Sequence, residues 1–291
     1  MKQSGLRIVV VAALMAAALL GYGAELKSET NQAFDGYTVL AEKQLREGPF
    51  LYSDAHAEAQ AAARRGETFV AEQKAAEYVV PGGLMHDWLG VSFFPGATIA
   101  GLRAQMQDYD NYKTVYNPDV IDSRLMARNG NAYKAYLKLE NKQFVKLIYD
   151  SEYAVEFSAP ATDRMEIISR STRMEQEGGD EGFLWRVNSY WRFEQAPDGV
   201  YVQCRVISLS RGLPIGIGWL RGPLERFPRE SMVRTMEATR RAATCGGANR
   251  VWLGEPAAVV SHPCHKHKDV TRMGHPWMRR ISLWIETKSH N

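Results

Sequence analysis

The stretch EGFLWRVNSYWRFEQAPDGVYVQCRVISLSRGLP, residues 181–214, alternates between apolar and polar side chains. One face of its first arm carries Phe183, Trp185, Val187, Trp191 and Phe193. The other face carries Arg186, Asn188, Tyr190 and Arg192. A period of two is typical of a half-buried strand. Asp198-Gly199 supplies a turn, and the alternation continues in Val200, Val202, Cys204 and Val206. We therefore predict a long antiparallel hairpin and expect its aromatic face to be the inner wall of the fold.

Further strands precede this hairpin, and one helix follows it. Strand patterns cover residues 85–94, 120–126, 132–139, 144–157 and 164–174, separated by turn signals. Two short helices are predicted at 98–106 and 109–116. A last helix is predicted at 229–243, with Pro228 near its first turn and Gly246-Gly247 at its end. An antiparallel sheet with helices on one face is an α+β architecture.

The segment before this sheet reads as two helical pieces and a short strand. Apolar residues recur at helical spacing from Phe34 to Leu45 before Gly48-Pro49, and an Ala-rich helix is predicted from Ser53-Asp54 to Gly66. Residues 67–80 have mixed strand character. We expect these pieces to pack on the outside of the main domain, with a flexible stalk as the alternative.

The first 23 residues have the pattern of a signal peptide. Lys2 and Arg7 precede an apolar run at 8–20, and Gly21 and Gly23 stand at positions −3 and −1 of a cut before Ala24. The apolar run is shorter than the roughly 20 residues that span a bilayer. We expect a periplasmic or secreted protein, with an uncleaved inner-membrane anchor as the alternative.

Charge and cysteine content exclude some function classes. The net charge is +3, but the excess of basic residues lies at the two ends of the chain, so residues 24–244 do not form a general nucleic-acid binder. Three cysteines leave at least one unpaired. Cys204 reads as a small buried apolar residue, and a Cys245–Cys264 bridge stays open.

Several strings resemble the START-like (SRPBCC, helix-grip) superfamily, in particular its exported bacterial members. They are GGLMHDWLGVSFFPGA, MQDYDNY, GFLWRVNSYWRF, VISLSRGLP and PRESMVRTMEATRRA. The resemblance implies a curved antiparallel sheet wrapped around a long C-terminal helix, with two short helices after the first strand. It divides the chain into a signal peptide (1–23), an N-terminal helical extension and linking strand (24–79), a START-like domain (80–244) and a weakly ordered tail (245–291). The superfamily contains carriers, cyclases and oxygenase domains, so the resemblance is specific for the fold and not for an activity.

A ligand cavity between the sheet and residues 232–243 is the expected site, with the Gly-rich loop at 212–218 as a lid. The candidate ligand contacts are Trp88, Asp108, Tyr109, Tyr112, Trp185, Tyr190, Trp191, Arg205, Trp219, Met232 and Met236. Trp185 and Trp191 favour apolar contact, whereas the arginines favour recognition only where their strand face looks inward.

Three polar groups are candidates for proton transfer, each with a plainer alternative. His86 is a cavity acid or base, or a hydrogen-bonded structural histidine. Asp108 lies at a helix junction, where capping is the commoner role. Tyr190 is the third candidate for proton transfer. No serine, cysteine or second histidine stands beside His86 to form a nucleophilic pair.

The tail clusters His262, Cys264, His265 and His267, followed by His275. These are zinc-ligand residue types, but their spacing matches no closed structural zinc pattern. A weakly ordered extension with adventitious metal affinity is therefore the prediction, and we expect no cofactor.

The leading hypothesis is an exported protein that binds a hydrophobic or amphipathic, lipid-like small molecule and no nucleic acid. A cyclase- or hydrolase-type enzyme that uses the same cavity is the second hypothesis. An envelope scaffold or metal-binding tail protein is the third. Transient membrane contact and the oligomeric state stay open.

Overall fold

The computed structural model describes residues 26–73, 78, 80–141, 146–178, 182–211 and 221–247, the last segment with side chains at 229–244. All described helices and strands belong to one compact unit that ends at Arg250. The predicted signal peptide, the lid loop with Trp219 and the histidine cluster of the tail lie outside the described residues.

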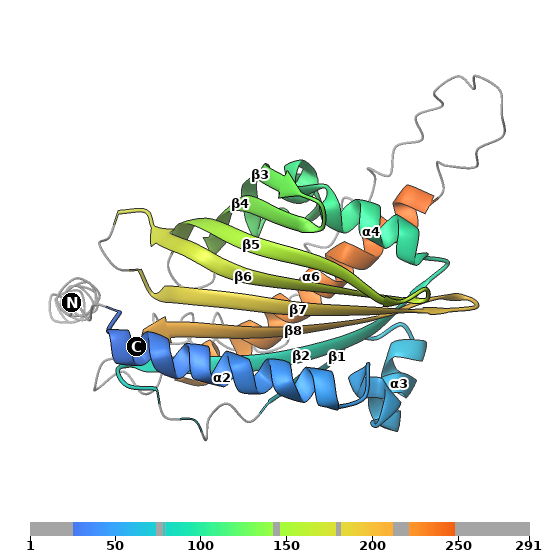
Figure 1. Cartoon of the computed structure of the whole chain (residues 1–291), viewed down its shortest axis with the longest axis horizontal. Helices are drawn as coiled ribbons and strands as arrows, with labels where there is room; N and C mark the ends of the chain where they lie inside the picture. The colour runs from blue at the N-terminus through green and yellow to red at the C-terminus, as the bar shows by residue number, and fades with distance from the viewer. Residues whose placement is uncertain are drawn as a thin grey trace, which may run out of the picture. The chain divides into compact units, whose positions relative to one another are not determined.

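The centre of this unit is a curved, unclosed antiparallel sheet of eight strands in the order β1-β2-β8-β7-β6-β5-β4-β3 (Figure 1). The strands are β1 (Phe69–Glu72), β2 (Gly83–Pro95), β3 (Val120–Asn129), β4 (Ala132–Asn141), β5 (Leu147–Ala161), β6 (Arg164–Gln176), β7 (Leu184–Ala196) and β8 (Gly199–Arg211). From β3 to β8, each strand pairs with the next along the chain. Strand β2 pairs with β8, which places the first long strand beside the last one.

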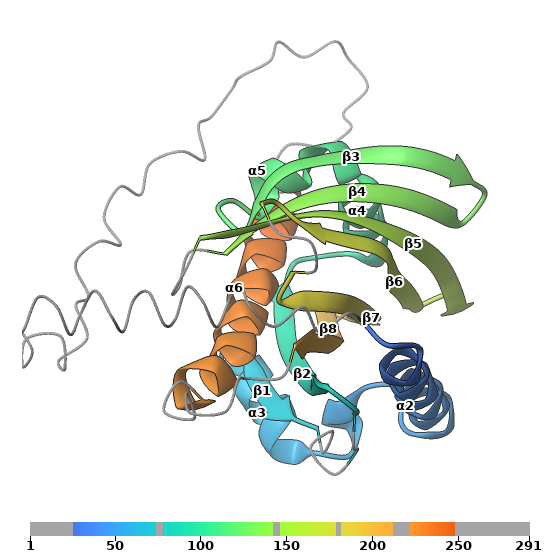
Figure 2. The ribbon, with the colours of Figure 1, turned by 90° about the vertical axis from the view of Figure 1, so that its left-hand side faces the viewer.

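Helices cover both faces of this sheet. Figure 2 shows α6 (Arg221–Gly247) on one side of the strands and α2 (Ser28–Glu47) on the other. We call the α6 side the inner face; it is also contacted by α4 (Ile99–Gln107), η3 (Tyr109–Asn111) and α5 (Tyr112–Val115). The α2 side is the outer face, where η1 (Tyr52–Asp54) and α3 (Ala57–Arg64) pack as well.

Three buried clusters hold these layers together. The largest joins the inner face to α4 and α6 through residues such as Phe94, Leu102 and Met236. A second joins α2 to the outer face of β7 and β8 through Phe34 and Ile207. A third joins η1 and α3 to the outer face of β2. The N-terminal helices therefore pack on the sheet, as expected, and are not a stalk.

The predicted hairpin is present. Strands β7 and β8 pair from Ala196–Gly199 to Leu184–Ser210, with Pro197 and Asp198 between the strands. Gly199 is required at the turn, because a Cβ there would lie 2.3 Å from the carbonyl oxygen of Phe94. Glycine is the residue that permits such a close approach of two backbones.

Helix α6 crosses β2 at another glycine. A Cβ on Gly90 would lie 2.9 Å from Cγ of Met232, a contact that real Cβ atoms do not make. Because Gly90 has no side chain, Met232 and Met236 of α6 pack directly against the backbone of β2. The sheet therefore grips the helix at its second strand.

The helices differ from the prediction mainly at their ends. Thr98 caps α4 as expected, since its side chain accepts a hydrogen bond from the amide of Gly101. The Ala-rich helix begins at Ala57, because Tyr52–Asp54 forms a separate 3-10 turn. Helix α6 begins at Arg221, eight residues before the predicted start at Arg229, so Pro228 lies within it. Proline is most favourable in the first turn, and in α6 this position belongs to Pro223 and not to Pro228.

One residue of the hairpin lies on a different face from the one its position in the sequence suggests. The pairing shifts between Leu184 and Arg186, so Trp185 is an extra residue in its strand. A bulge of this kind reverses the alternation on its far side. Trp185 therefore packs on the outer face with α2, while Trp191 and Phe193 lie on the inner face.

Candidate functional site

The inner face of the sheet is the candidate site, and its floor follows from the strand pairing. One row of directly paired residues crosses six strands on this face. In strand order β2, β8, β7, β6, β5, β4, the row is Trp88, Val206, Ser189, Ser169, Val155 and Tyr133. Large aromatic side chains stand at its two ends, and small side chains fill its middle.

Toward the β7–β8 turn, the inner face is filled by large side chains. Trp191, Phe193, Phe157 and Met165 are all buried there. They belong to the same cluster as Leu102 and Met106 of α4 and Met232 and Met236 of α6. Cys204 is buried in this part, as predicted for a small apolar residue, and burial raises the pKa of its thiol.

Toward the other end of the hairpin, the floor is lined by small, half-buried side chains. Ser189 pairs directly with Ser169, and Ser208 lies two residues beyond Val206, the partner of Ser189. We call these three residues the serine patch. All three are half-buried, and no hydrogen bond links their hydroxyls to another described residue.

Other polar atoms on the inner face are buried without a partner among the described residues. They are Nε1 of Trp88, Oγ of Ser92, Oε1 of Gln105 and the hydroxyl of Tyr133. An unsatisfied buried polar atom costs about 1–3 kcal/mol. Tyr133 is only 4% exposed, so its hydroxyl requires a partner from outside the described residues, such as a bound water or ligand. Two of these atoms belong to Trp88 and Tyr133, which stand at the two ends of the cross-strand row that contains Ser189 and Ser169.

Tyr133 belongs to a cluster of tyrosines at the β4 end of the site. Its ring centroid lies 6.0 Å from that of Tyr109, which lies 4.8 Å from that of Tyr112. The hydroxyl of Tyr112 donates to the carbonyl of Met106 at 2.7 Å. Desolvation raises the pKa of Tyr112 well above its usual value and that of Tyr116 to about 12. These phenols are therefore neutral hydrogen-bonding groups at physiological pH.

The floor of the site carries no charged side chain. On the inner face of the described parts of β2, β8, β7, β6 and β5, strand alternation places no Asp, Glu, Lys or Arg. His86 stands at one end, where its Nε2 lies 3.4 Å from Oγ of Ser210. Arg128 stands beyond the other end, exposed, with its guanidinium 5.0 Å from the ring centroid of Tyr133. The site is therefore apolar with neutral hydrogen-bonding groups.

Three predicted ligand contacts lie on the opposite face. Arg205 pairs with Asp87, its Nη2 lying 2.6 Å from Oδ2, and the two side chains are 6% and 0% exposed. Tyr37 of α2 donates to the same carboxylate at 2.7 Å. Tyr190 donates to Glu42 of α2 at 3.1 Å. Tyr190, Arg205 and the bulged Trp185 thus hold α2 to the outer face, which corrects the expectation that they line the inner cavity.

The other predicted contacts divide between the site and its surroundings. Trp88, Tyr109, Tyr112, Trp191, Met232 and Met236 all belong to the inner-face cluster. Asp108 is exposed between α4 and η3, and Trp219 lies outside the described residues. The weak metal candidates of the tail are also outside them. Within the described residues, no three His, Cys, Asp or Glu side chains gather as a metal site.

The structure does not assemble the three candidate proton-transfer residues. His86 lies on the inner face, Tyr190 on the outer face, and Asp108 is exposed at a helix junction. Catalysis by a concerted acid and base requires both groups within hydrogen-bond reach of one substrate. These three side chains cannot serve together in one site.

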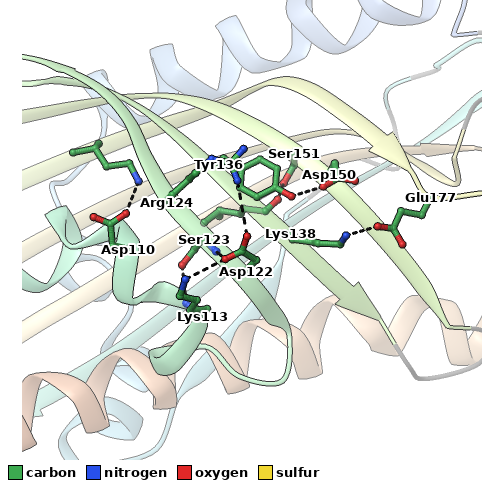
Figure 3. A network of polar contacts seen from close by, with 12 residues as sticks. Asp110, Lys113, Asp122, Ser123, Arg124, Tyr136, Lys138, Asp150, Ser151 and Glu177 are labelled. Atoms are coloured by element: carbon green, nitrogen blue, oxygen red, sulfur yellow. Dashed lines mark hydrogen bonds and ion pairs between the residues drawn. The ribbon is translucent and has the colours of Figure 1, made fainter.

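A second polar network lies across β3, β4 and β5 (Figure 3). Asp110 accepts from the amide of Leu125 at 3.0 Å, and Lys113 lies 3.1 Å from Asp122. Tyr136 bonds Asp150, and Lys138 pairs with Glu177. The ion pairs are largely exposed and the charges compensate one another, so each pair contributes little to stability. This network links the edge strand β3 to η3 and α5, and its charged side chains already have partners.

The sequence carries part of the signal for the serine patch. Ser189 interrupts the aromatic face between Val187 and Trp191, and Ser208 continues the apolar face after Val206. Small polar residues on an otherwise apolar strand face indicate a place where a side chain meets water or a ligand. Ser169 and Tyr133 join them only through strand pairing, which the sequence alone does not give.

The architecture identifies the fold. An unclosed, curved antiparallel sheet grips the C-terminal helix, and the short helices α4, η3 and α5 follow the first long strand. The fold is START-like. This confirms the predicted helix-grip architecture. No helix among the described residues is long and apolar enough to cross a membrane.

Comparisons with known proteins give structural similarity without sequence similarity. No protein-family model and no curated protein sequence matches the chain. A STAR-related lipid transfer protein fragment from Xanthomonas axonopodis is 16% identical, with a TM-score of 0.44, over 60% of this chain and 98% of that one. The lipid transfer and protein localization domain of human StarD13 is 10% identical, with a TM-score of 0.43, over 67% and 98%. An aromatase/cyclase from Streptomyces is 11% identical, with a TM-score of 0.40, over 61% and 94%.

Proposed function

We propose that the chain binds an apolar or amphipathic small molecule on the inner face of the sheet, beside α6. The observation that carries this proposal is the composition of the floor. Apolar walls surround hydroxyls that have no hydrogen-bond partner among the described residues, in the serine patch and at Tyr133. A ligand site is typically apolar with a few polar groups that fix orientation.

The energetics favour this mode of binding. Burial of apolar ligand surface contributes about 25 cal/mol per Å². A ligand that also satisfies the hydroxyl of Tyr133 removes a cost that the empty protein carries, unless water already meets it. Binding is therefore driven by apolar contact and oriented by hydrogen bonds.

Mass spectrometry of compounds extracted from the purified full chain tests the proposal. We expect one apolar compound at near-stoichiometric amount, released when the protein is denatured. Ser189→Phe fills the floor and should abolish retention, whereas Ser158→Phe, at an exposed position of β5, should leave it unchanged. Equal retention by both variants, or no retained compound together with no thermal shift on adding lipids, contradicts the proposal.

We further propose that residues 1–23 direct export and are removed. The basic start, the short apolar run and Gly21 and Gly23 support this. The intact mass of the protein recovered from a bacterial periplasmic fraction checks it: a mass that begins at Ala24 agrees, and retention of residues 1–23 argues for an anchor instead.

A further inference from the structure

We propose that the inner-face site selects an uncharged ligand that carries hydroxyl or carbonyl oxygens along its length. The serine patch, Trp88 and Tyr133 recognise these groups. This inference rests on the proposed function and names the class of molecule that the site accepts.

The absence of charge from the floor is the first support. Alternation places the charged residues of the central strands on the outer face, where Arg205, Arg192 and Arg170 pair with acidic partners. An ionised carboxylate on the inner face would meet no Lys or Arg on the described floor. Moving an unpaired charge out of water is far more costly than moving a hydrogen-bonded hydroxyl. A charged head group is therefore excluded from the floor.

The serine patch supplies the second support. Direct cross-strand neighbours have Cβ atoms about 4.5–5.5 Å apart, and diagonal neighbours lie about 7–8 Å apart. Ser169 and Ser189 are a direct pair, and Ser208 is diagonal to Ser189. The three hydroxyls form one contiguous polar strip in an apolar floor. A plain hydrocarbon chain leaves this strip without partners, whereas a ligand with several oxygens satisfies it.

The groups at the two ends of the row, Trp88 and Tyr133, differ in hydrogen-bonding chemistry, so they favour one orientation of a bound ligand. The indole Nε1–H of Trp88 only donates, so it requires an acceptor oxygen. The hydroxyl of Tyr133 either donates or accepts. Between them, four strands carry small side chains, which span about 14 Å at the usual strand spacing of about 4.8 Å. A flat molecule with oxygens spaced along this length fits the pattern.

Three fluorescent probes with one skeleton test the inference: pyrene, pyrenemethanol and pyrenecarboxylate, titrated against the full chain at pH 7. One added hydrogen bond contributes about 1 kcal/mol, so we expect pyrenemethanol to bind about 5-fold more tightly than pyrene. Pyrenecarboxylate should bind more weakly than either. Equal binding of all three, or a preference for the carboxylate, overturns the inference and leaves the proposed function intact. Binding of none contradicts both.

Replacement of all three patch residues, by Ser169→Ala, Ser189→Ala and Ser208→Ala together, should remove the preference for pyrenemethanol and leave pyrene affinity unchanged. A matched Ser158→Ala variant on the exposed end of β5 should keep the preference. Tyr133→Phe tests the β4 end in the same way. If the triple variant retains the full preference, the serine patch does not recognise the ligand. Because the readout is a ratio of affinities, a general loss of stability does not imitate the expected result.

Discussion

The ion pair between Asp87 and Arg205 joins two adjacent strands beneath a helix. The guanidinium donates three hydrogen bonds to the carboxylate, from Nε to Oδ1 at 2.9 Å and to Oδ2 at 3.1 Å, and from Nη2 to Oδ2 at 2.6 Å. Tyr37 donates to the same carboxylate, and burial, with the carboxylate as a further cause, raises the pKa of that phenol. The pair therefore ties α2 to the sheet through one shared acceptor.

Replacement of Asp87 by Asn should be strongly destabilising, because it leaves the charge of Arg205 buried without a counter-charge. Loss of one partner of a buried pair costs about 3–5 kcal/mol. The matched control is Glu175→Gln in the exposed Arg173–Glu175 pair, for which we expect a cost below about 1 kcal/mol. Urea unfolding of both variants measures the difference; equal costs would show that the buried pair has no special role.

Single residues also show where sequence reasoning stops. Alternation assigns Trp191 correctly to the inner face, because the strand around it is regular. It misassigns Trp185, because a bulge is a local irregularity of pairing with no sequence signature here. Alternation places Tyr190 and Arg205 on one face of the sheet, but it does not tell whether that face is the inner or the outer one. That identity depends on α2, about 150 residues away in sequence, as the Tyr190–Glu42 bond shows.

At the scale of elements, α2 is part of the folded unit. Phe34 is fully buried against the outer face, and its ring lies 4.9 Å from the guanidinium of Arg186. Val39 of the same helix is 62% exposed. The helix thus has one face that packs and one that does not.

Phe34→Ala should lower the free energy of unfolding by about 3–5 kcal/mol, because it opens a cavity under α2. Val39→Ala, on the exposed face of the same helix, should change it by no more than about 0.5 kcal/mol. Circular dichroism during chemical denaturation measures both. A small change for Phe34→Ala would mean that α2 docks loosely and that the packing contributes little.

Elements were the most predictable level. Each predicted strand and helix in the described residues exists, because periodicity and turn signals are local properties. Their ends were less predictable: η1 separates from α3, and α6 extends back past Pro228. The predicted start assigns Pro228 to the first turn, whereas Pro223 occupies that turn.

At the scale of the molecule, the interior contains many neutral phenols. Burial is the leading cause of the raised pKa of Tyr109, Tyr112 and Tyr190, and desolvation raises that of Tyr116 to about 12. A free tyrosine titrates near pH 10. Above that pH, the unfolded chain releases protons that the folded chain retains, so stability falls as pH rises.

We therefore expect full stability below about pH 10 and a steady loss between pH 10 and 12, with up to about 1.4 kcal/mol per pH unit for each such tyrosine. Tyr116→Phe should make the loss shallower over this range. Urea unfolding at several alkaline pH values measures the slope. Identical slopes for the two proteins would show that Tyr116 does not contribute.

The fold as a whole followed from the order of elements, and the site followed only in part. The sequence predicts a sheet, a gripping helix and an aromatic inner wall, because each depends on local pattern. The row from Trp88 to Tyr133 depends on five strand pairings in sequence, and no local pattern reports them. The position of the polar groups in the site therefore depends on strand pairing, whereas the apolar groups follow from the periodicity of the sequence.

The two covers of the central hairpin come from opposite ends of the described chain. Helix α2 is made before any strand, and α6 is made after all of them. During synthesis, α4 is available to cover part of the inner face early, whereas Met232 and Met236 complete this layer only after α6 has been made. A chain that stops before residue 232 would hold its outer layer and lack Met232 and Met236, leaving an apolar sheet face open to self-association. The last helix is thus the element that completes the inner layer of this fold.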